Sequence, residues 1–539
     1  MRNSLINKKF RREVTIYLLK DRYKSDIEKK FPPHNGIQLS EKLPFSGYFF
    51  PMPSAPETPE WVLIIQTILK DDSFELKGQH PGGIIFLHYK LKFYAITFGH
   101  AWSSIKPNWA EPDFGKRVTL NAITRNKLCE LKAEQVFAAW HSSNERAPVP
   151  TDFATFDIAA DRDLVYSIEG QPEKNIAEIL GHSIKGGASL KVTIDFSEIT
   201  DALNLIFELE ESKDYKERWP ELDNLTIIKD NEITKKLDEI LDNEIQDADA
   251  VKKIILTVPT MKRSESLTPS GYYIGPLRKK GKHTHPTNYY LTIQSWLSML
   301  SSKGKKANID NANHTTVHIF NSENKEISKC TLYECIAFET CLENNGKNRS
   351  YILSGGKWYE ASDDFIKRIN REIEKIPAIE NHPLREWGNE CEKDYNELCS
   401  NPSKGVYSFD AKNIFVGDKK SQFEFCDILD MQSKTLFFVK NIGASNHCSH
   451  LSEQVNRTVD LFFSLDDFFR KKLAEKVEQK YPELGTEWLK DKPQSFDYTL
   501  CLVSMGRDIN NLPLFAKCSL ARLFKELSIK NYKVYFIRV

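Results

Sequence analysis

The stretch from Gln422 to Gln454 constrains the fold of this chain most. Its first apolar run carries two acids, Glu424 and Asp427, and a polar bend separates it from a second apolar run that ends at Lys440. Two β-type runs joined by a short polar connection predict a hairpin. Adjacent strands bring side chains within reach of each other when the register allows it. We therefore expect Asp427 and Lys440 to project near one another, ahead of a helix that carries Gln454.

The sequence around this hairpin predicts a helix, three strands and a further alternation of helix and strand. A run that is nearly all apolar, Tyr498 to Val503, is typical of a central strand buried on both faces. The expected elements are a helix over 384–399, strands over 405–410, 422–429 and 436–440, a helix over 450–480, a strand over 496–504, a helix over 512–527 and a strand over 533–539.

The order of Asp427, Lys440 and Gln454 on strand, strand and helix resembles the core of the PD-(D/E)XK nuclease superfamily. The resemblance implies a C-terminal αβββαβ domain that hydrolyses phosphodiester bonds with Mg²⁺. Asp427 then corresponds to the first acid and a metal ligand, and Lys440 to the lysine that orients or activates the attacking water. Gln454 corresponds to the polar helix residue that positions water or nucleic acid. Glu392 in the preceding helix is a candidate for a glutamate that some members carry.

One position departs from that pattern. The residue two before Lys440, where the superfamily has Asp or Glu, is Phe438. A second metal ligand must then come from elsewhere, with Glu424 and Asp410 as candidates, or the site is inactive. An inactive nuclease fold would serve as a module that binds nucleic acid or a phage protein. An ordinary edge hairpin with solvated charges is the plain alternative.

A second resemblance covers nearly the whole chain. The runs FYAITFGHAW, DFGKRVTLNAI, FDIAADRDLVYSIEG and GGKWYEASDDF resemble a sporadically distributed bacterial family of uncharacterised proteins. Such a distribution is expected of genes carried by mobile elements and defence islands. The resemblance implies a role in antiphage defence, with a phage protein as the trigger. It does not indicate which biochemical activity the chain has.

A basic segment with interleaved tyrosines, residues 261–290, is a second candidate site. Cations can bind phosphates and aromatic rings can stack on bases, so this composition suits a groove for DNA or RNA. The alternative is an exposed loop whose lysines only increase solubility. The residues proposed to bind nucleic acid are Arg278, Lys279, Lys280 and Lys282, with Tyr272, Tyr273, Tyr289 and Tyr290 between and around them.

Composition limits the remaining possibilities. Lys plus Arg and Asp plus Glu each number 75 among the 539 residues, so any contact with nucleic acid must come from a local patch. The length predicts two or three domains. We expect an α/β protein with an α+β N-terminal region around a mixed sheet (1–258), a middle α/β region that includes the basic loop (259–380) and the nuclease-like domain (381–539).

Cysteine usage and hydropathy indicate a cytoplasmic protein. The ten cysteines form no Cys-x-x-Cys pair, which favours reduced thiols over zinc or disulfides. Cys448 lies between His447 and His450, and this is the nearest approach to a metal cluster. Capping of the following helix and lining of its first turn is the favoured interpretation of these residues. No run of about 18 apolar residues predicts a membrane span.

Four further stretches carry structural expectations. Ile84 to Tyr89 and Lys92 to Phe98 predict a hairpin inside a sheet. Asp113 to Ile123 predicts a turn at Gly115 and then a strand, and residues 330–342 predict a helix. Residues 349–360 predict a hairpin turned at two glycines, followed by an amphipathic helix over 363–376.

Overall fold

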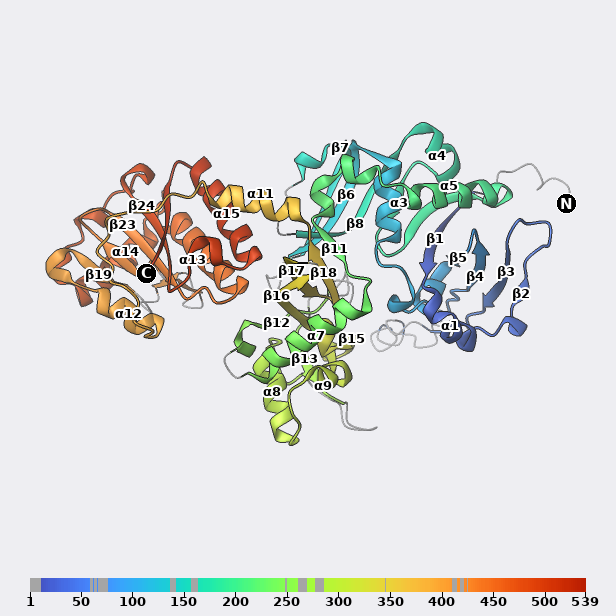
Figure 1. The fold of residues 1–539 in the computed structure, drawn as a ribbon, viewed down its shortest axis with the longest axis horizontal. Helices are drawn as coiled ribbons and strands as arrows, with labels where there is room; N and C mark the ends of the chain where they lie inside the picture. The colour runs from blue at the N-terminus through green and yellow to red at the C-terminus, as the bar shows by residue number, and fades with distance from the viewer. Residues whose placement is uncertain are drawn as a thin grey trace. The chain divides into compact units, whose positions relative to one another are not determined.

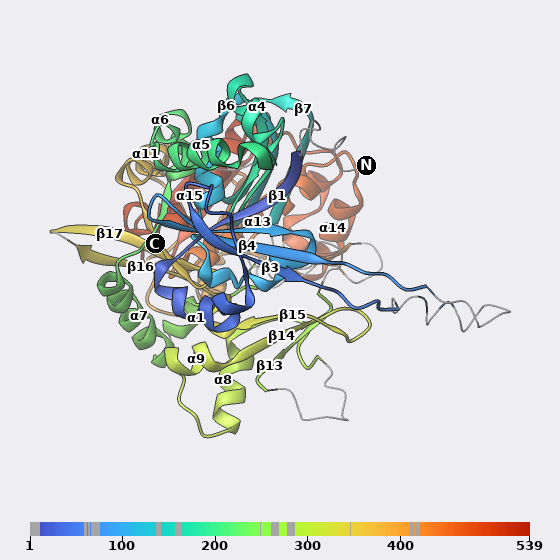
Figure 2. The same ribbon diagram turned by 90° about the vertical axis from the view of Figure 1, so that its right-hand side faces the viewer.

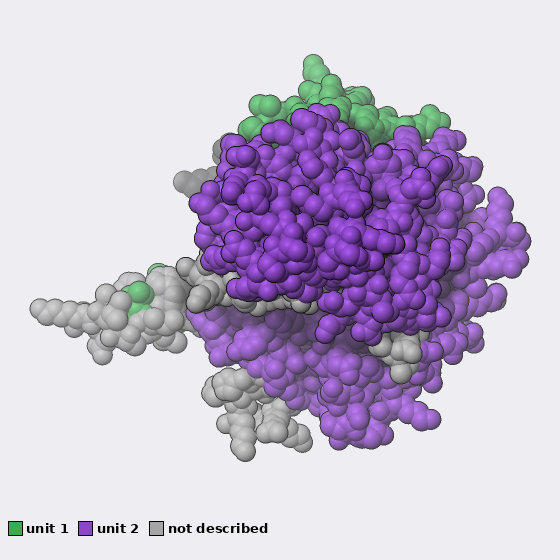
Figure 3. Space-filling model, turned by 90° about the vertical axis from the view of Figure 1, so that its left-hand side faces the viewer, with its two compact units in different colours: residues 1–134, 142–223 green, residues 135–141, 224–539 purple. Residues whose placement is uncertain are grey.

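The computed structural model forms two compact units, residues 1–134 with 142–223 and residues 135–141 with 224–539, which are coloured separately in Figure 3. We describe each unit by itself. The structure describes residues 11–58, 62, 65, 76–135, 142–156, 163–247, 250–259, 269–276, 286–344, 346–409, 414–416, 421–423 and 425–539.

Unit 1 is built on a ten-stranded sheet with the order β2-β3-β4-β5-β1-β10-β9-β8-β6-β7 (Figure 1). The predicted hairpin is confirmed, because β4 and β5 pair antiparallel inside this sheet. Strand β5 buries Tyr94 and Ile96 in one apolar cluster and Phe93 and Ala95 in another. The strands are β1 (Arg11–Leu19), β2 (Ile37–Gln38), β3 (Ser46–Met52), β4 (Gly82–Tyr89), β5 (Lys92–Phe98), β6 (Ile123–Gln135), β7 (Ser142–Thr151), β8 (Asp163–Pro172), β9 (Ile184–Gly186) and β10 (Leu190–Asp195).

The stretch after this hairpin is a helix, α3 (Phe114–Ala122), so the predicted turn and strand are wrong. The glycine that suggested a turn serves close packing instead. A Cβ atom on Gly115 would lie 1.9 Å from the carbonyl oxygen of Ser189, at the start of β10. Helix α3 packs on β8, β9 and β10 and on α5 (Ile199–Glu211), and α4 (Lys174–Leu180) packs on β10.

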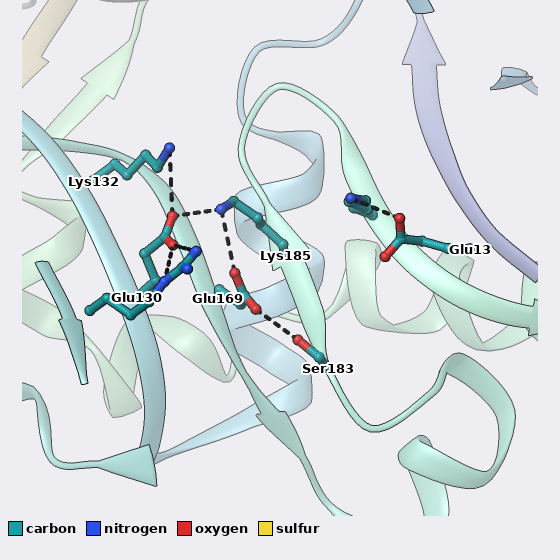
Figure 4. Close-up of polar contacts among 8 residues, drawn as sticks. Glu13, Glu130, Lys132, Glu169, Ser183 and Lys185 are labelled. Carbon is teal, nitrogen blue, oxygen red and sulfur yellow. Dashed lines mark hydrogen bonds and ion pairs between the residues drawn. The ribbon is translucent and has the colours of Figure 1, made fainter. Parts of the chain in front are cut away.

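A buried carboxylate in unit 1, that of Glu130 on β6, forms ion pairs with three cationic side chains (Figure 4). Arg146 on β7 donates from Nε over 2.9 Å, Lys185 on β9 lies 2.5 Å away, and Lys132 lies 3.6 Å away. The Glu130 side chain is only 1% exposed. Burial opposes its ionisation, but hydrogen bonds from Lys185 and Arg146 outweigh burial and lower the pKa of Glu130. The cluster ties together strands that are far apart in sequence.

Replacing this carboxylate should destabilise the protein. Glu130→Gln should lower the free energy of unfolding at pH 7 by about 2–3 kcal/mol, because it removes the charge of a buried carboxylate that pairs with several cations. Since the folded pKa is lowered, the contribution is complete above the unfolded pKa of about 4.3 and is lost as the pH falls through the folded value. Urea unfolding followed by tryptophan fluorescence at pH 7 and below pH 4 measures both effects.

The matched control is Glu13→Gln, whose exposed pair with Lys191 (2.8 Å) appears in the same view (Figure 4). We expect little change from it, because exposed pairs contribute little. Equal losses in the two variants, or a difference that persists in acid, would contradict the assignment.

The first part of unit 2 contains two sheets, ordered β11-β18-β17-β16-β12 and β13-β14-β15. Figure 2 shows β13, β14 and β15 beside α8 and α9. The hairpin of β17 and β18 and the helix that follows are confirmed. The elements are α7 (Asn231–Gln246), β11 (Leu225–Ile227), β12 (Ile255–Leu256), β13 (Gly271–Ile274), α8 (Ile293–Ser302), α9 (Ile309–His314), β14 (Thr316–Phe320), β15 (Glu326–Thr331), α10 (Leu332–Cys335), β16 (Ile336–Asn344), β17 (Lys347–Ser354), β18 (Lys357–Ala361) and α11 (Asp363–Ile373).

The helix expected over 330–342 is wrong, because only the single turn α10 is helical there. Thr331 and Glu334 form a capping box that starts this turn. Strand β16 then pairs with β17 along its length from Phe338 to Asn344. Sheet pairing in the folded chain overrides the local helical pattern.

The last part of unit 2 has a five-stranded sheet with the order β19-β22-β23-β24-β25 (Figure 1). The first three strands pair antiparallel, and β24 and β25 continue the sheet parallel to β23. The elements are α12 (Glu392–Cys399), β19 (Val406–Ser408), β20 (Ile414–Val416), β21 (Ser421–Phe423), β22 (Ile428–Asp430), β23 (Thr435–Lys440), α13 (Ser445–Phe462), α14 (Phe468–Lys480), β24 (Thr499–Ser504), α15 (Leu514–Ile529) and β25 (Lys533–Arg538).

Three expectations for this part need correction. The strand expected over 422–429 is divided, because β21 pairs with β20 while β22 belongs to the main sheet. The helix expected over 384–399 is only α12, since residues 385–390 form a loop in which Asn389 has φ 70° and Glu390 accepts from Arg385 and the Gly388 amide. The long helix over 450–480 is two helices, and the first begins earlier, at Ser445.

The burial of β24 confirms the predicted central strand. It lies between β23 and β25, and Leu500 to Val503 are fully buried. Residues of β23 and β24 alternate between two apolar clusters, one with α13, α14 and α15 and one with α12. Both faces of this sheet are therefore covered, as expected for parallel strands.

Two observations bear on the environment of the chain. All ten cysteines are free. In the described ranges, no helix combines the length and apolar character needed to cross a membrane.

Candidate active site

Asp427 lies at the entrance to β22 and is held by two donors. The backbone N–H of Val439 donates to its Oδ2 over 2.6 Å, and Nε2 of Gln454 donates to its Oδ1 over 3.3 Å. One helical turn further along α13, the Thr458 hydroxyl donates to the carbonyl oxygen of Phe425. Asp427 is only 3% exposed. The side chain predicted to project toward Lys440 is thus hydrogen-bonded to Gln454 and to the backbone of β23, and the carboxylate of Asp427 has a structural role.

Lys440 is the last residue of β23, at the carboxyl end of the parallel part of the sheet. Its Nζ lies 2.7 Å from Oε1 of Glu392, the first residue of α12. Both side chains are about one-third exposed, so each remains accessible to a ligand. Open α/β sheets bind ligands outside the carboxyl ends of their parallel strands, which is where this pair lies.

Position 438, where the resemblance to PD-(D/E)XK nucleases predicts an acid, has an apolar environment. Phe438 is fully buried and packs in the apolar cluster that contains α13. Asp410 and Glu424, the proposed substitutes, lie outside the described residues. Among the residues that are described, no three His, Cys, Asp or Glu side chains gather in a group able to hold a metal ion. Asp427, with a donor on each oxygen, does not by itself fit a Mg²⁺ site.

Two histidines at the start of α13 adjoin the site. Nδ1 of His447 lies 2.7 Å from the carbonyl oxygen of Asn441, and the backbone N–H of Gly443 donates to the same nitrogen over 3.3 Å. His447 interacts electrostatically with Lys440, His450 and Glu392. The sequence predicted that these histidines cap the following helix and line its first turn, and both belong to α13.

Two buried polar side chains lie next to these residues. Ser504 pairs in register with Lys440, and Asn396 follows Glu392 by one turn of α12. Both are fully buried, and within the described structure neither the Ser504 hydroxyl nor the Asn396 amide has a hydrogen-bond partner. Buried polar groups of this kind are uncommon and often occur at functional sites. No sequence pattern distinguished them.

The basic loop is described only in part. Arg278, Lys279, Lys280 and Lys282 all lie outside the described residues. Tyr289 and Tyr290 are 81% and 72% exposed, as a stacking surface requires. Tyr272 is 2% exposed, so its proposed place in a groove is wrong. It belongs to β13 and contributes to the apolar core under α7 and α8.

The fold and this site define a mixed α/β protein with several sheets and a polar edge in its C-terminal sheet. A family described as a family of unknown function, DUF6119, matches residues 14–539, and the chain belongs to it. No curated protein and no solved structure matches the chain.

Substitution of Asp427 should test its role as a hydrogen-bond acceptor for the backbone of β23. Asp427→Ala should lower the free energy of unfolding by about 1–3 kcal/mol, because the Val439 N–H loses its acceptor in a buried place. Asp427→Asn keeps an oxygen that can accept from that N–H, so its free energy of unfolding should fall much less. Thermal unfolding of the two variants measures the difference, and equal losses would show that the hydrogen bond contributes little.

Proposed function

We propose that the C-terminal part of unit 2 binds nucleic acid and cleaves phosphodiester bonds at the site formed by Asp427, Lys440, Gln454 and Glu392. The observation that carries the proposal is the presence of two polar pairs, Lys440 with Glu392 and Gln454 with Asp427, on or beside the neighbouring strands β22 and β23. Groups drawn together from distant parts of a chain in this way are typical of functional sites.

The strand arrangement supports the same proposal. Between α12 and α13, three strands of the main sheet (β19, β22 and β23) pair antiparallel, with the hairpin of β20 and β21 inserted, and the parallel strand β24 follows α13 and α14. This succession agrees with the αβββαβ order that the resemblance to PD-(D/E)XK nucleases implies. Asp427, Lys440 and Gln454 lie on it in the order expected from that resemblance.

The charges of the side chains suggest a role for each of them. The Lys440 ammonium would compensate the negative charge of a phosphate, exchanging part of its pairing with Glu392 for the ligand. Gln454, anchored to Asp427, would orient a polar group of the substrate. Because Glu392 and Lys440 are both partly exposed, a phosphate can reach them without unfolding the sheet.

The requirement of this site for Mg²⁺ is a question for experiment. The PD-(D/E)XK superfamily has two acids that bind the metal ion. Among the described residues, Asp427 is the one acid found at the corresponding positions of this chain.

A second candidate function is recognition without cleavage. The buried Phe438 favours it, since an apolar residue there removes a metal ligand while preserving the core. Such a module would bind nucleic acid or a phage protein. Antiphage defence as the biological setting remains a proposal that rests on the sequence resemblance.

The test is cleavage of plasmid DNA, linear DNA and RNA by the full chain and its Lys440→Ala variant, with Mg²⁺, Mn²⁺ or EDTA. We expect cleavage by the wild type and a loss of at least 100-fold in the variant, because the phosphate charge is no longer compensated. Stability should change by less than about 1 kcal/mol, since the pair with Glu392 is partly exposed.

Lys480→Ala provides a matched control. Lys480 also pairs with a glutamate of α12, Glu397 (3.4 Å), and its side chain is 30% exposed, as that of Lys440 is. The control should cleave normally. Unchanged cleavage by Lys440→Ala would contradict the site, and binding without cleavage by the wild type would favour the recognition module.

A further inference from the structure

The helices α13 and α15 both begin without a side-chain cap of their own. The first N–H groups of a helix have no partner within it, and the side chain of the preceding residue usually accepts from one of them. Those preceding residues are Ala444 and Pro513, and neither forms a side-chain hydrogen bond to its helix. Alanine and proline have no side-chain oxygen. An acceptor at these helix starts must therefore come from another part of the chain.

Glu339 on β16 is that acceptor, and it serves both helices. Its Oε2 accepts from the hydroxyl of Ser445 and its Oε1 from the backbone N–H of Leu514, each over 2.6 Å. These donors are the first residues of α13 and α15. The backbone N–H of Phe515 also hydrogen-bonds to this carboxylate. The partial positive charge at the amino end of a helix further favours an anion in this position.

The surroundings of Glu339 hold the carboxylate against the start of α15. Burial raises the pKa of Glu339, while the donors at the two helix starts and the positive charge of Lys517 oppose that shift. Nζ of Lys517 donates in turn to Oδ1 of Asn370 on α11, over 3.1 Å. The rings of Phe365 on α11 and Phe515 lie 6.5 Å apart in an edge-on arrangement. Both β16 and α11 therefore hold the beginning of α15.

The beginning of α13 adjoins the proposed active site. Residues 441–444 are all that separates Lys440, the end of β23, from Ser445. Further along the same helix, Gln454 donates to Asp427. A displacement of the first turn of α13 would therefore affect both the segment that follows Lys440 and the helix that carries Gln454.

We propose that Glu339 is a positioning residue of this site, which couples the position of β16 to the positions of Lys440 and Gln454 through the start of α13. The inference rests on the phosphodiester-cleaving function proposed above, because it assigns a means of regulation to the same site. Coupling of this kind travels through packed elements and hydrogen bonds that are in direct contact. The bond between Glu339 and Ser445 provides that contact.

Hydrogen–deuterium exchange followed by mass spectrometry tests the positioning directly. Glu339→Ala removes the acceptor from both helix starts, so the amides of residues 441–450 and 512–518 should exchange about 10-fold faster, with β4 and β5 unchanged. Glu339→Gln keeps an oxygen that can accept from the Leu514 N–H, so exchange over 512–518 should return toward the wild-type rate.

Two further variants separate positioning from a general loss of stability. Ser445→Ala removes only the bond at α13 and should accelerate exchange over 441–450 alone, which keeps the test decisive if Glu339→Ala does not fold. Glu343→Ala is the matched control, because Glu343 is an exposed residue on the same face of β16. Its exchange should equal that of the wild type. Faster exchange in Glu343→Ala to the extent seen in Glu339→Ala would overturn the inference.

Cleavage of nucleic acid tests the connection to the active site. Glu339→Ala should lower kcat/KM by about 10- to 100-fold, because small misplacements of reacting groups are costly, and Glu339→Gln should restore part of the loss. Wild-type exchange over 441–450, or wild-type cleavage, in Glu339→Ala would overturn the inference, and cleavage that depends on Lys440 would leave the proposed function standing. Failure of the wild type to cleave any substrate would overturn the proposed function and the coupling to it.

Discussion

The parallel pairing of β23 with β24 is the constraint on which the C-terminal part of the structure depends. Its register places Lys440 beside Ser504 at the carboxyl ends of two neighbouring strands. The same two strands are buried on both faces, so their direction and register are strongly determined by the core. At this level Lys440 is about one-third exposed, whereas Ser504 stays buried.

Buried carboxylates tie this chain together. Glu130 joins three strands of unit 1, and Asp427 joins β23 to α13. Glu339 on β16 accepts from the Ser445 hydroxyl and from the Leu514 amide, both over 2.6 Å, and so connects the starts of α13 and α15 to the preceding sheet. Burial raises the pKa of Glu339, against the effect of these donors. Each acid is stable in its place because several donors offset the loss of hydration.

The candidate site combines structural and chemical demands in the same side chains. Asp427 serves as an acceptor for the backbone of β23, while Lys440 and Glu392 pair at the more exposed side. His447 is locked by the connection between β23 and α13. Phe438, two residues before Lys440, is fully buried and contributes to the apolar core under α13.

Local pattern alone determined several elements of this protein. The hairpin of β4 and β5, the central strand β24 and the helix α11 all follow from short-range periodicity and order. Only the tertiary structure decided that Gly115 lies in a packed helix, that β16 is a strand and that Lys440 pairs with Glu392, 48 residues away. These outcomes depend on contacts with distant segments, whose positions are set by the packing of the whole sheet rather than by neighbouring residues.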